Sequence, residues 1–321
     1  MSGGRRFEKV LVPLDGTPFA EEALPVALAM AERLEGCLRL VSVVPYRPPL
    51  EVSGPRESEE AYVKAWVTER TKRAETYLQE VEGRIRDGGY AGDLETEVLA
   101  GGPVEVLDQQ ARRWGADLVV MTTQARRPVA RAWLGSVADG LVRRGPCPIL
   151  LWRPEREDAP DLAARPDVQR ILVPLDGSER SASVTPYAQA MAWAFGAGLS
   201  VVGVIPPDEP QVTAYPALAP LEYDREIAQE AENLRERLGE AARAMEREGG
   251  GAVSVELVED RDPATGILQH RELLGADMVA LSTRGHGGVA RMLLGSVADK
   301  VIRGGRVPVL VHRPTLEGGQ R

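Results

Sequence analysis

The sequence predicts an α/β protein of two tandem domains, each with a five-stranded, mainly parallel sheet covered by helices on both faces. The chain repeats itself, because KVLVPLDGT at 9–17 recurs as RILVPLDGS at 170–178, and LGSVAD occurs at both 134–139 and 294–299. Within each copy, short apolar runs alternate with stretches of helical periodicity, which is typical of strand–helix–strand units. We therefore expect two doubly wound, Rossmann-like domains.

The length of 321 residues is large for one domain and comfortable for two. We expect the first domain at 1–153 and the second at 168–321. The segment between them, 154–167, is polar and contains prolines, which favours a surface linker.

The composition, with 43% hydrophobic and 27% charged residues, is that of an ordinary soluble protein. A net charge of −9 argues against a general nucleic-acid or membrane surface but not against a small anionic ligand. The sequence shows neither a membrane span nor a signal peptide, so we expect a cytoplasmic protein. Cys37 and Cys147 are expected as reduced, packed thiols without a disulfide or metal role.

Each copy begins with an apolar run, VLVPLD or ILVPLD, that is long enough for a buried parallel strand. A helix follows, with Thr17 or Ser178 as its N-cap and, in the first copy, Pro18 at its first position. The second strand reads CLRLVSVV or GLSVVGVI. A proline-containing loop then leads into a long helix with one apolar face.

The third strand reads LETEVLA or VSVELVE, and a helix connects it to a fourth strand in GADLVVMTT or GADMVALST. The fifth strands contain Pro148 and Pro308, so we expect them to begin at the proline or to lie at a sheet edge. Two bare edges invite pairing. We expect the copies to dock through their fifth strands as an internal pseudo-dimer, and a further homodimer stays open.

The stretch that points to function is STRGHGGVARMLLGSVAD, at 282–299, between the fourth strand and the next helix. Glycines at a turn let an anion approach the backbone closely, and N–H groups at a helix start supply donors for phosphate. Gly285 to Gly288 form such a turn, and Gly295 with Ser296 marks the start of the helix.

Asp176 ends the first strand of the same copy. In an open parallel sheet, ligands bind at the carboxyl ends of the strands where the strand order reverses, so these features should converge. A carboxylate there can accept from ribose hydroxyls or a base amino group. Each feature also has a structural explanation: Asp176 or Ser296 could be helix caps, the glycines an ordinary turn, and Arg284 a solvated side chain.

Through these residues the chain resembles the universal stress protein family in its tandem two-domain form, over nearly its whole length. The family pattern has an Asp two residues after the strand-one proline, then Gly, two residues, Gly, nine residues and Gly-Ser or Gly-Thr. The second copy departs from it at Ser282 and at Arg284. The resemblance implies an adenine nucleotide alpha hydrolase-like version of the fold and a nucleotide site. Its candidates here are Pro174, Asp176, Ser178, Val204, Leu281, Ser282, Arg284, Gly285, Gly288, Gly295, Ser296 and Val297.

The corresponding stretch of the first copy is TTQARRPVARAWLGSVAD, at 122–139. It holds Thr and Ala in place of the two loop glycines, and Pro128 removes a donor. We therefore expect a degenerate first copy that binds nucleotide weakly or not at all. Its equivalent residues are Asp15, Val43, Ala125, Gly135 and Ser136.

Three classes of function stay open. The first is a stress-response regulator that binds ATP, ADP or AMP and has little or no catalytic activity. Whether Mg²⁺ binds together with the nucleotide stays open. The second is a slow ATPase or a nucleotidyl transferase, for which His286 is the one candidate base near the phosphates. The third is an interaction scaffold in which neither copy binds nucleotide.

Overall fold

The computed structural model describes most of the chain. The described residues are 7–46, 56–123, 134–153, 160–207, 220–249, 251–283 and 294–314, and the side chains of 56–60 and 220–227 are not among them. They divide into two compact units, 6–167 and 168–321. Each unit contains one copy of the sequence repeat.

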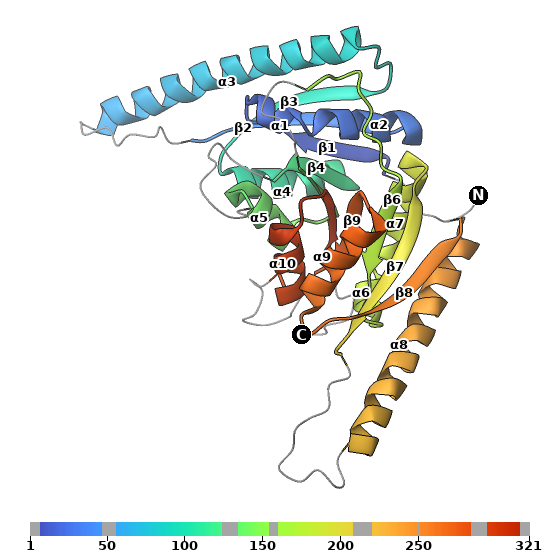
Figure 1. Ribbon diagram of the computed structural model, residues 1–321. Coiled ribbons are helices and arrows are strands. Elements are labelled where there is room, and N and C mark those ends of the chain that lie inside the picture. Colours follow the sequence, from blue (N-terminus) through green and yellow to red (C-terminus); the bar gives the residue numbers. More distant parts are fainter. Residues whose placement is uncertain are drawn as a thin grey trace. The chain divides into compact units, whose positions relative to one another are not determined.

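The N-terminal unit alternates strands and helices in the predicted order (Figure 1). Its elements are β1 Lys9–Pro13, α1 Pro18–Glu21, α2 Leu24–Leu34, β2 Cys37–Val44, α3 Arg56–Asp87, β3 Leu94–Ala100, α4 Pro103–Trp114, β4 Leu118–Thr122, α5 Ser136–Arg144 and β5 Ile149–Trp152.

The C-terminal unit repeats the same series. Its elements are β6 Arg170–Pro174, α6 Glu179–Ala182, α7 Thr185–Phe195, β7 Gly198–Ile205, α8 Pro220–Arg247, β8 Val253–Glu259, α9 Pro263–Leu274, β9 Met278–Ser282, α10 Ser296–Gly304 and β10 Val309–His312.

The strands of each unit are parallel and follow one order, β3-β2-β1-β4-β5 in the first unit and β8-β7-β6-β9-β10 in the second. Helices cover both faces of each sheet (Figure 1). The predicted fold class is confirmed. In each sheet, successive strands are added first on one side of β1 or β6 and then on the other side. This reversal of strand order creates the switch point at which such sheets bind ligands.

The fifth strands begin one residue after their prolines, close to the start that was expected at the proline itself. Pro148 and Pro308 precede β5 and β10, and each contributes its carbonyl as acceptor to the fourth strand, from Val119 N–H and Val279 N–H. Proline lacks an N–H, so this arrangement uses the one backbone group that it has. The docking of the two copies through these strands stays a prediction.

The single helix expected after the first strand was wrong in detail, because the structure has two helices there. The one-turn α1 is capped by Thr17, whose hydroxyl accepts from Ala20 N–H, and α2 starts at Leu24. Pro25 occupies the first turn of α2, and Pro186 does the same in α7. A proline fits the first turn of a helix but breaks an interior, so it separates the two helices.

An aspartate before each fourth strand ties that strand to the first. Asp117 Oδ2 accepts from the N–H groups of Glu8 and Lys9, at 3.1 and 3.0 Å. In the other unit, Asp277 Oδ2 accepts from the N–H groups of Gln169 and Arg170, at 2.8 and 2.9 Å. These bonds anchor the amino ends of the central strands, so the switch point lies at their opposite ends.

The described part of the predicted linker stays with the N-terminal unit. Arg165 pairs with Glu32 on α2 at 2.7 Å. Residues 154–159 lie outside the described residues. Among the helices that the structure describes, none is long and apolar enough to cross a membrane.

The long helix α3 is fastened to the N-terminal unit by a buried carboxylate. Glu21 is only 5% exposed and accepts from Tyr77 Oη at 2.9 Å and from the Arg84 guanidinium at 2.7 Å. Burial and the neighbouring Glu21 raise the pKa of Tyr77 above its ordinary value, so its hydroxyl stays protonated and donates. Ala182 occupies the equivalent position in the other unit, so this clamp belongs to the first copy alone.

Replacing Tyr77 by Phe should lower the free energy of unfolding by about 1 kcal/mol, because Glu21 loses a donor in a buried setting. Tyr62→Phe is the matched control, since Tyr62 lies on the same helix and is 44% exposed. Urea denaturation followed by circular dichroism measures both. Equal effects of the two substitutions would show that the buried hydroxyl contributes nothing.

Candidate functional site

The two central strands of the C-terminal unit separate before they end. β6 pairs with β7 along all five of its residues, from Arg170 to Pro174. It pairs with β9 only at Ile171 and Leu172, opposite Met278 and Val279. Beyond Leu172 the strands part, so their carboxyl ends leave a space between them.

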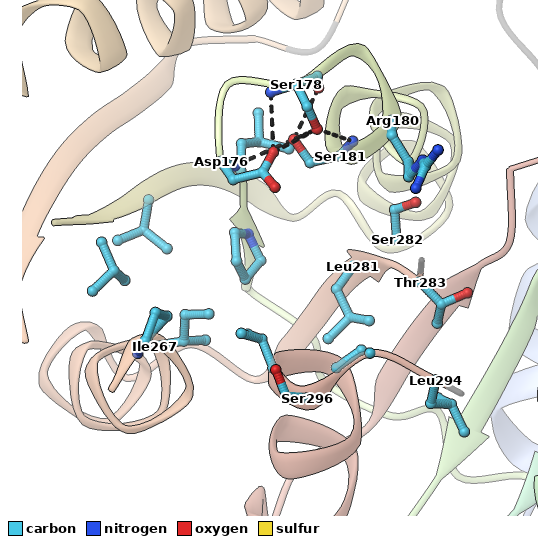
Figure 2. Close-up of a pocket in the computed structure, with 18 residues that line it drawn as sticks. Asp176, Ser178, Arg180, Ser181, Ile267, Leu281, Ser282, Thr283, Leu294 and Ser296 are labelled. Carbon is cyan, nitrogen blue, oxygen red and sulfur yellow. Dashed lines mark hydrogen bonds between the residues drawn. The ribbon is translucent and has the colours of Figure 1, made fainter. Parts of the chain in front are cut away.

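A cavity of about 530 Å³ occupies this space (Figure 2). Its walls come from the ends of β6, β7 and β9, from the start of α10, and from α6 and α9. The lining residues are Pro174, Leu175, Asp176, Ser178, Arg180, Ser181, Val202, Val204, Pro263, Ile267, Leu281, Ser282, Thr283, Leu294, Gly295, Ser296, Val297 and Ala298. Its volume lies in the range of about 300 to 1,000 Å³ that is usual for small-molecule and cofactor sites.

A tight turn after β6 presents Asp176 to the cavity. Asp176 Oδ1 accepts from the N–H of Ser178 at 3.0 Å and from its hydroxyl at 2.6 Å. Ser178 in turn caps α6, because its Oγ accepts from Ser181 N–H at 3.1 Å. The helix cap is therefore Ser178 and not Asp176, and the turn orients the carboxylate at the end of the strand.

The start of α10 forms a second wall, opposite this turn in Figure 2. Gly295 is the N-cap with φ of +84°, a conformation that glycine adopts freely and other residues adopt rarely. Ser296, Val297 and Ala298 follow in the first turn and line the cavity. The N–H groups of a first helical turn lack acceptors within the helix, and the helix dipole is positive there, so this wall favours an anion.

The remaining walls are mostly apolar. Val202 and Val204 come from β7, Ile267 from α9 and Leu281 from β9. The cavity thus combines an apolar middle, a carboxylate at one side and a helix start at another. A ligand with a flat apolar part, hydroxyl or amino donors and a negative group would complement all three.

The structure brings together every predicted second-copy residue that it describes. Nine of them line the one cavity: Pro174, Asp176, Ser178, Val204, Leu281, Ser282, Gly295, Ser296 and Val297. The other three, Arg284, Gly285 and Gly288, lie outside the described residues, as does His286. The role of each residue in binding stays a prediction.

The sequence reasoning missed three polar residues of the cavity wall, which are Arg180, Ser181 and Thr283. Arg180 and Ser181 lie on the one-turn helix α6 and line the cavity. The repeat holds a signal for them, because the equivalent positions in the first copy are Phe19 and Ala20. A comparison of the two copies in this turn finds both positions.

The first copy has a smaller cavity at the equivalent place. Its volume is about 170 Å³, and Asp15, Val43, Gly135 and Ser136 line it as predicted equivalents. Phe19 and Ala20 also line it, where the other copy has Arg180 and Ser181. Ala125 lies outside the described residues. This cavity falls below the range of about 300 to 1,000 Å³ for small-molecule sites.

The described histidine and cysteine side chains near these sheets are packed groups. His270 on α9 is 8% exposed, and its Nε2 lies 3.1 Å from Glu256 Oε2. Both cysteines are free thiols. Burial raises the pKa of Cys147 to about 12 and also raises the pKa of Cys37, so neither is activated as a thiolate.

Comparison with known proteins identifies relatives for both halves. The model of the Universal stress protein family matches residues 6–153 and 167–313. The universal stress protein Rv2005c of Mycobacterium tuberculosis is 34% identical over 221 residues, which cover 68% of this chain and 69% of that protein. The universal stress protein Rv1996 of the same organism is 29% identical over 318 residues, covering 95% and 94%.

Solved structures support the fold over the same length. A universal stress protein from Archaeoglobus fulgidus matches with a TM-score of 0.66 and 20% identity, covering 96% of this chain and 99% of that one. A putative universal stress protein from Pseudomonas aeruginosa matches with a TM-score of 0.62 and 19% identity, covering 96% and 94%.

The glycines of the two LGSVAD segments should respond differently to substitution. Gly295→Ala places a side chain at positive φ and should lower the free energy of unfolding by about 1 kcal/mol or more. Gly135 has φ of −57°, which alanine tolerates, so Gly135→Ala should change the free energy of unfolding by less than about 0.5 kcal/mol. The urea unfolding midpoints of the two variants give the comparison, and equal midpoints would contradict the different backbone conformations.

Proposed function

Because the chain belongs to the universal stress protein family, we propose that it is a stress-response regulator whose C-terminal half binds ATP or a related adenine nucleotide. The observation that carries this proposal is the cavity between the parted ends of β6 and β9, with Asp176 on one wall and the start of α10 on another. The binding residues, the choice of nucleotide and the domain boundaries at 153 and 168 are part of the proposal.

The chemistry of the cavity wall complements the parts of a nucleotide. The Asp176 carboxylate accepts hydrogen bonds, which suits ribose hydroxyls or a base amino group. Val204 and Leu281 offer apolar surface to the base. The N–H groups at the start of α10 and the Ser296 hydroxyl suit phosphate oxygens. The net charge of −9 does not oppose this, because the donors are local.

The N-terminal half enters the proposal as a partner domain without a nucleotide. Its cavity of about 170 Å³ is lined by Phe19 among other residues, and its loop sequence lacks the glycines. The turn at Asp15 nevertheless repeats the turn at Asp176, because Asp15 Oδ1 accepts from Thr17 N–H at 3.0 Å. We therefore assign the retained Asp15, Gly135 and Ser136 to folding of that half.

Binding without chemistry is enough for a regulatory role. A ligand that binds the folded state alone stabilises it by about 2.7 kcal/mol at a hundredfold excess over Kd. Occupancy of the cavity then reports the nucleotide level as a change in the stability or surface of the C-terminal unit. Mg²⁺ would bind together with a triphosphate, through the phosphate oxygens. Catalysis is not part of the proposal.

The proposal predicts that ATP raises the melting temperature of the protein by several degrees at saturating concentration. Asp176→Ala should abolish most of that rise, because it removes the acceptor on the cavity wall. Asp15→Ala is the matched control, since it removes the same kind of turn bond in the other half. Differential scanning fluorimetry with and without ATP measures all three proteins.

A flat response of the unmodified protein to ATP, ADP and AMP would contradict the proposal and favour an interaction scaffold. Loss of the rise in Asp15→Ala with retention in Asp176→Ala would place the nucleotide in the other half.

A further inference from the structure

A cationic side chain, Arg180 on α6, lies on the wall of the C-terminal cavity. Arg180 is half-buried and lines the cavity together with Ser282 at the end of β9 (Figure 2). The Ser183 and Ser282 hydroxyls lie 3.4 Å apart, which joins the end of α6 to the end of β9. The Arg180 side chain extends toward Ser282, at the side of the cavity where α6 meets the end of β9 (Figure 2).

The turn that carries Arg180 is held by its own polar side chains. Ser178 Oγ accepts from Ser181 N–H, and Ser181 Oγ donates to the Ser178 carbonyl at 2.9 Å. Ser183 Oγ donates to the Arg180 carbonyl at 2.6 Å. These hydrogen bonds restrict the backbone that carries Arg180. A ligand that contacts this side chain therefore loses less conformational entropy of the protein on binding.

The guanidinium of Arg180 forms no ion pair with any carboxylate that the structure describes. Asp176 lies in the same cavity, and its Oδ1 accepts from the N–H and the hydroxyl of Ser178. A half-buried charge is unfavourable until it is paired, and a guanidinium matches two oxygens of a phosphate at once. A negatively charged group of a ligand in the cavity would therefore pair with the Arg180 guanidinium.

We propose that Arg180 binds a phosphate group of the nucleotide in the C-terminal cavity and makes that half select phosphorylated over unphosphorylated adenine nucleosides. This inference rests on the proposed function. It adds a side-chain charge to the backbone donors at the start of α10. Phe19, at the equivalent position of the first copy, lines the smaller cavity with an uncharged ring, so that copy lacks this charge.

The test is the affinity of purified full-length protein for ATP and for adenosine, measured by isothermal titration calorimetry. Arg180→Ala should weaken ATP binding about tenfold to a hundredfold, because a hydrogen bond to a charged group is lost, and should leave adenosine binding unchanged. Arg180→Lys should recover part of the loss, since it keeps the charge but not the two-pronged geometry.

Arg235→Ala is the matched control, because Arg235 lies on α8 and pairs with Glu232 away from the cavity. It should leave the affinity for ATP unchanged. The melting temperature without ligand should be the same for the unmodified protein and for the Arg180 variants, which separates lost binding from lost folding.

Equal ATP affinity of Arg180→Ala and the unmodified protein would overturn this inference while leaving the proposed function intact. An equal loss for ATP and adenosine would also overturn it, since Arg180 would then act on the whole site. If the unmodified protein binds neither ATP nor adenosine, the proposed function itself fails, and this inference fails with it.

Discussion

The early parting of the two central strands is the constraint on which the C-terminal site depends. β6 stays paired with β7 to its end, but its pairing with β9 stops after Leu172. Asp277 fastens the opposite ends of the two strands by accepting from the N–H groups of Gln169 and Arg170. The sheet is therefore closed at one end and open at the other. The turn after β6, the end of β9 and the start of α10 all meet at the open end.

The N-terminal unit has the same parting, so the topology alone does not make a site. β1 and β4 pair only at Val10 and Leu11, and Asp117 fastens their amino ends in the same way. The cavities nevertheless differ threefold in volume, about 530 against about 170 Å³. The described walls differ at several positions, among them Phe19 in place of Arg180, Ala20 in place of Ser181 and Met121 in place of Leu281. One copy has kept the fold, and the other combines the fold with a cavity of ligand size.

Much of the fold could be predicted from the sequence, because buried parallel strands are apolar runs with clear ends. The third strands, 94–100 and 253–259, have the predicted bounds. The break before α2 was missed although Pro25 is visible in the sequence. The cavity wall was harder. Arg180 lies on a helix of one turn, too short for its periodicity to show which side faces inward. The identical LGSVAD segments hold Gly135 and Gly295 at different φ, so that difference comes from residues outside the segment.

In the proposed function, one half of the repeat binds an adenine nucleotide and the other half does not. The most direct measurement saturates the full chain with ATP, removes free nucleotide by gel filtration, denatures the protein and counts the adenine nucleotide released per chain. We expect a single nucleotide per chain. Two nucleotides per chain would contradict this expectation, because the smaller cavity of the N-terminal half would then also bind nucleotide. No released nucleotide, together with no detectable ATP binding by calorimetry, would contradict the claim for both halves.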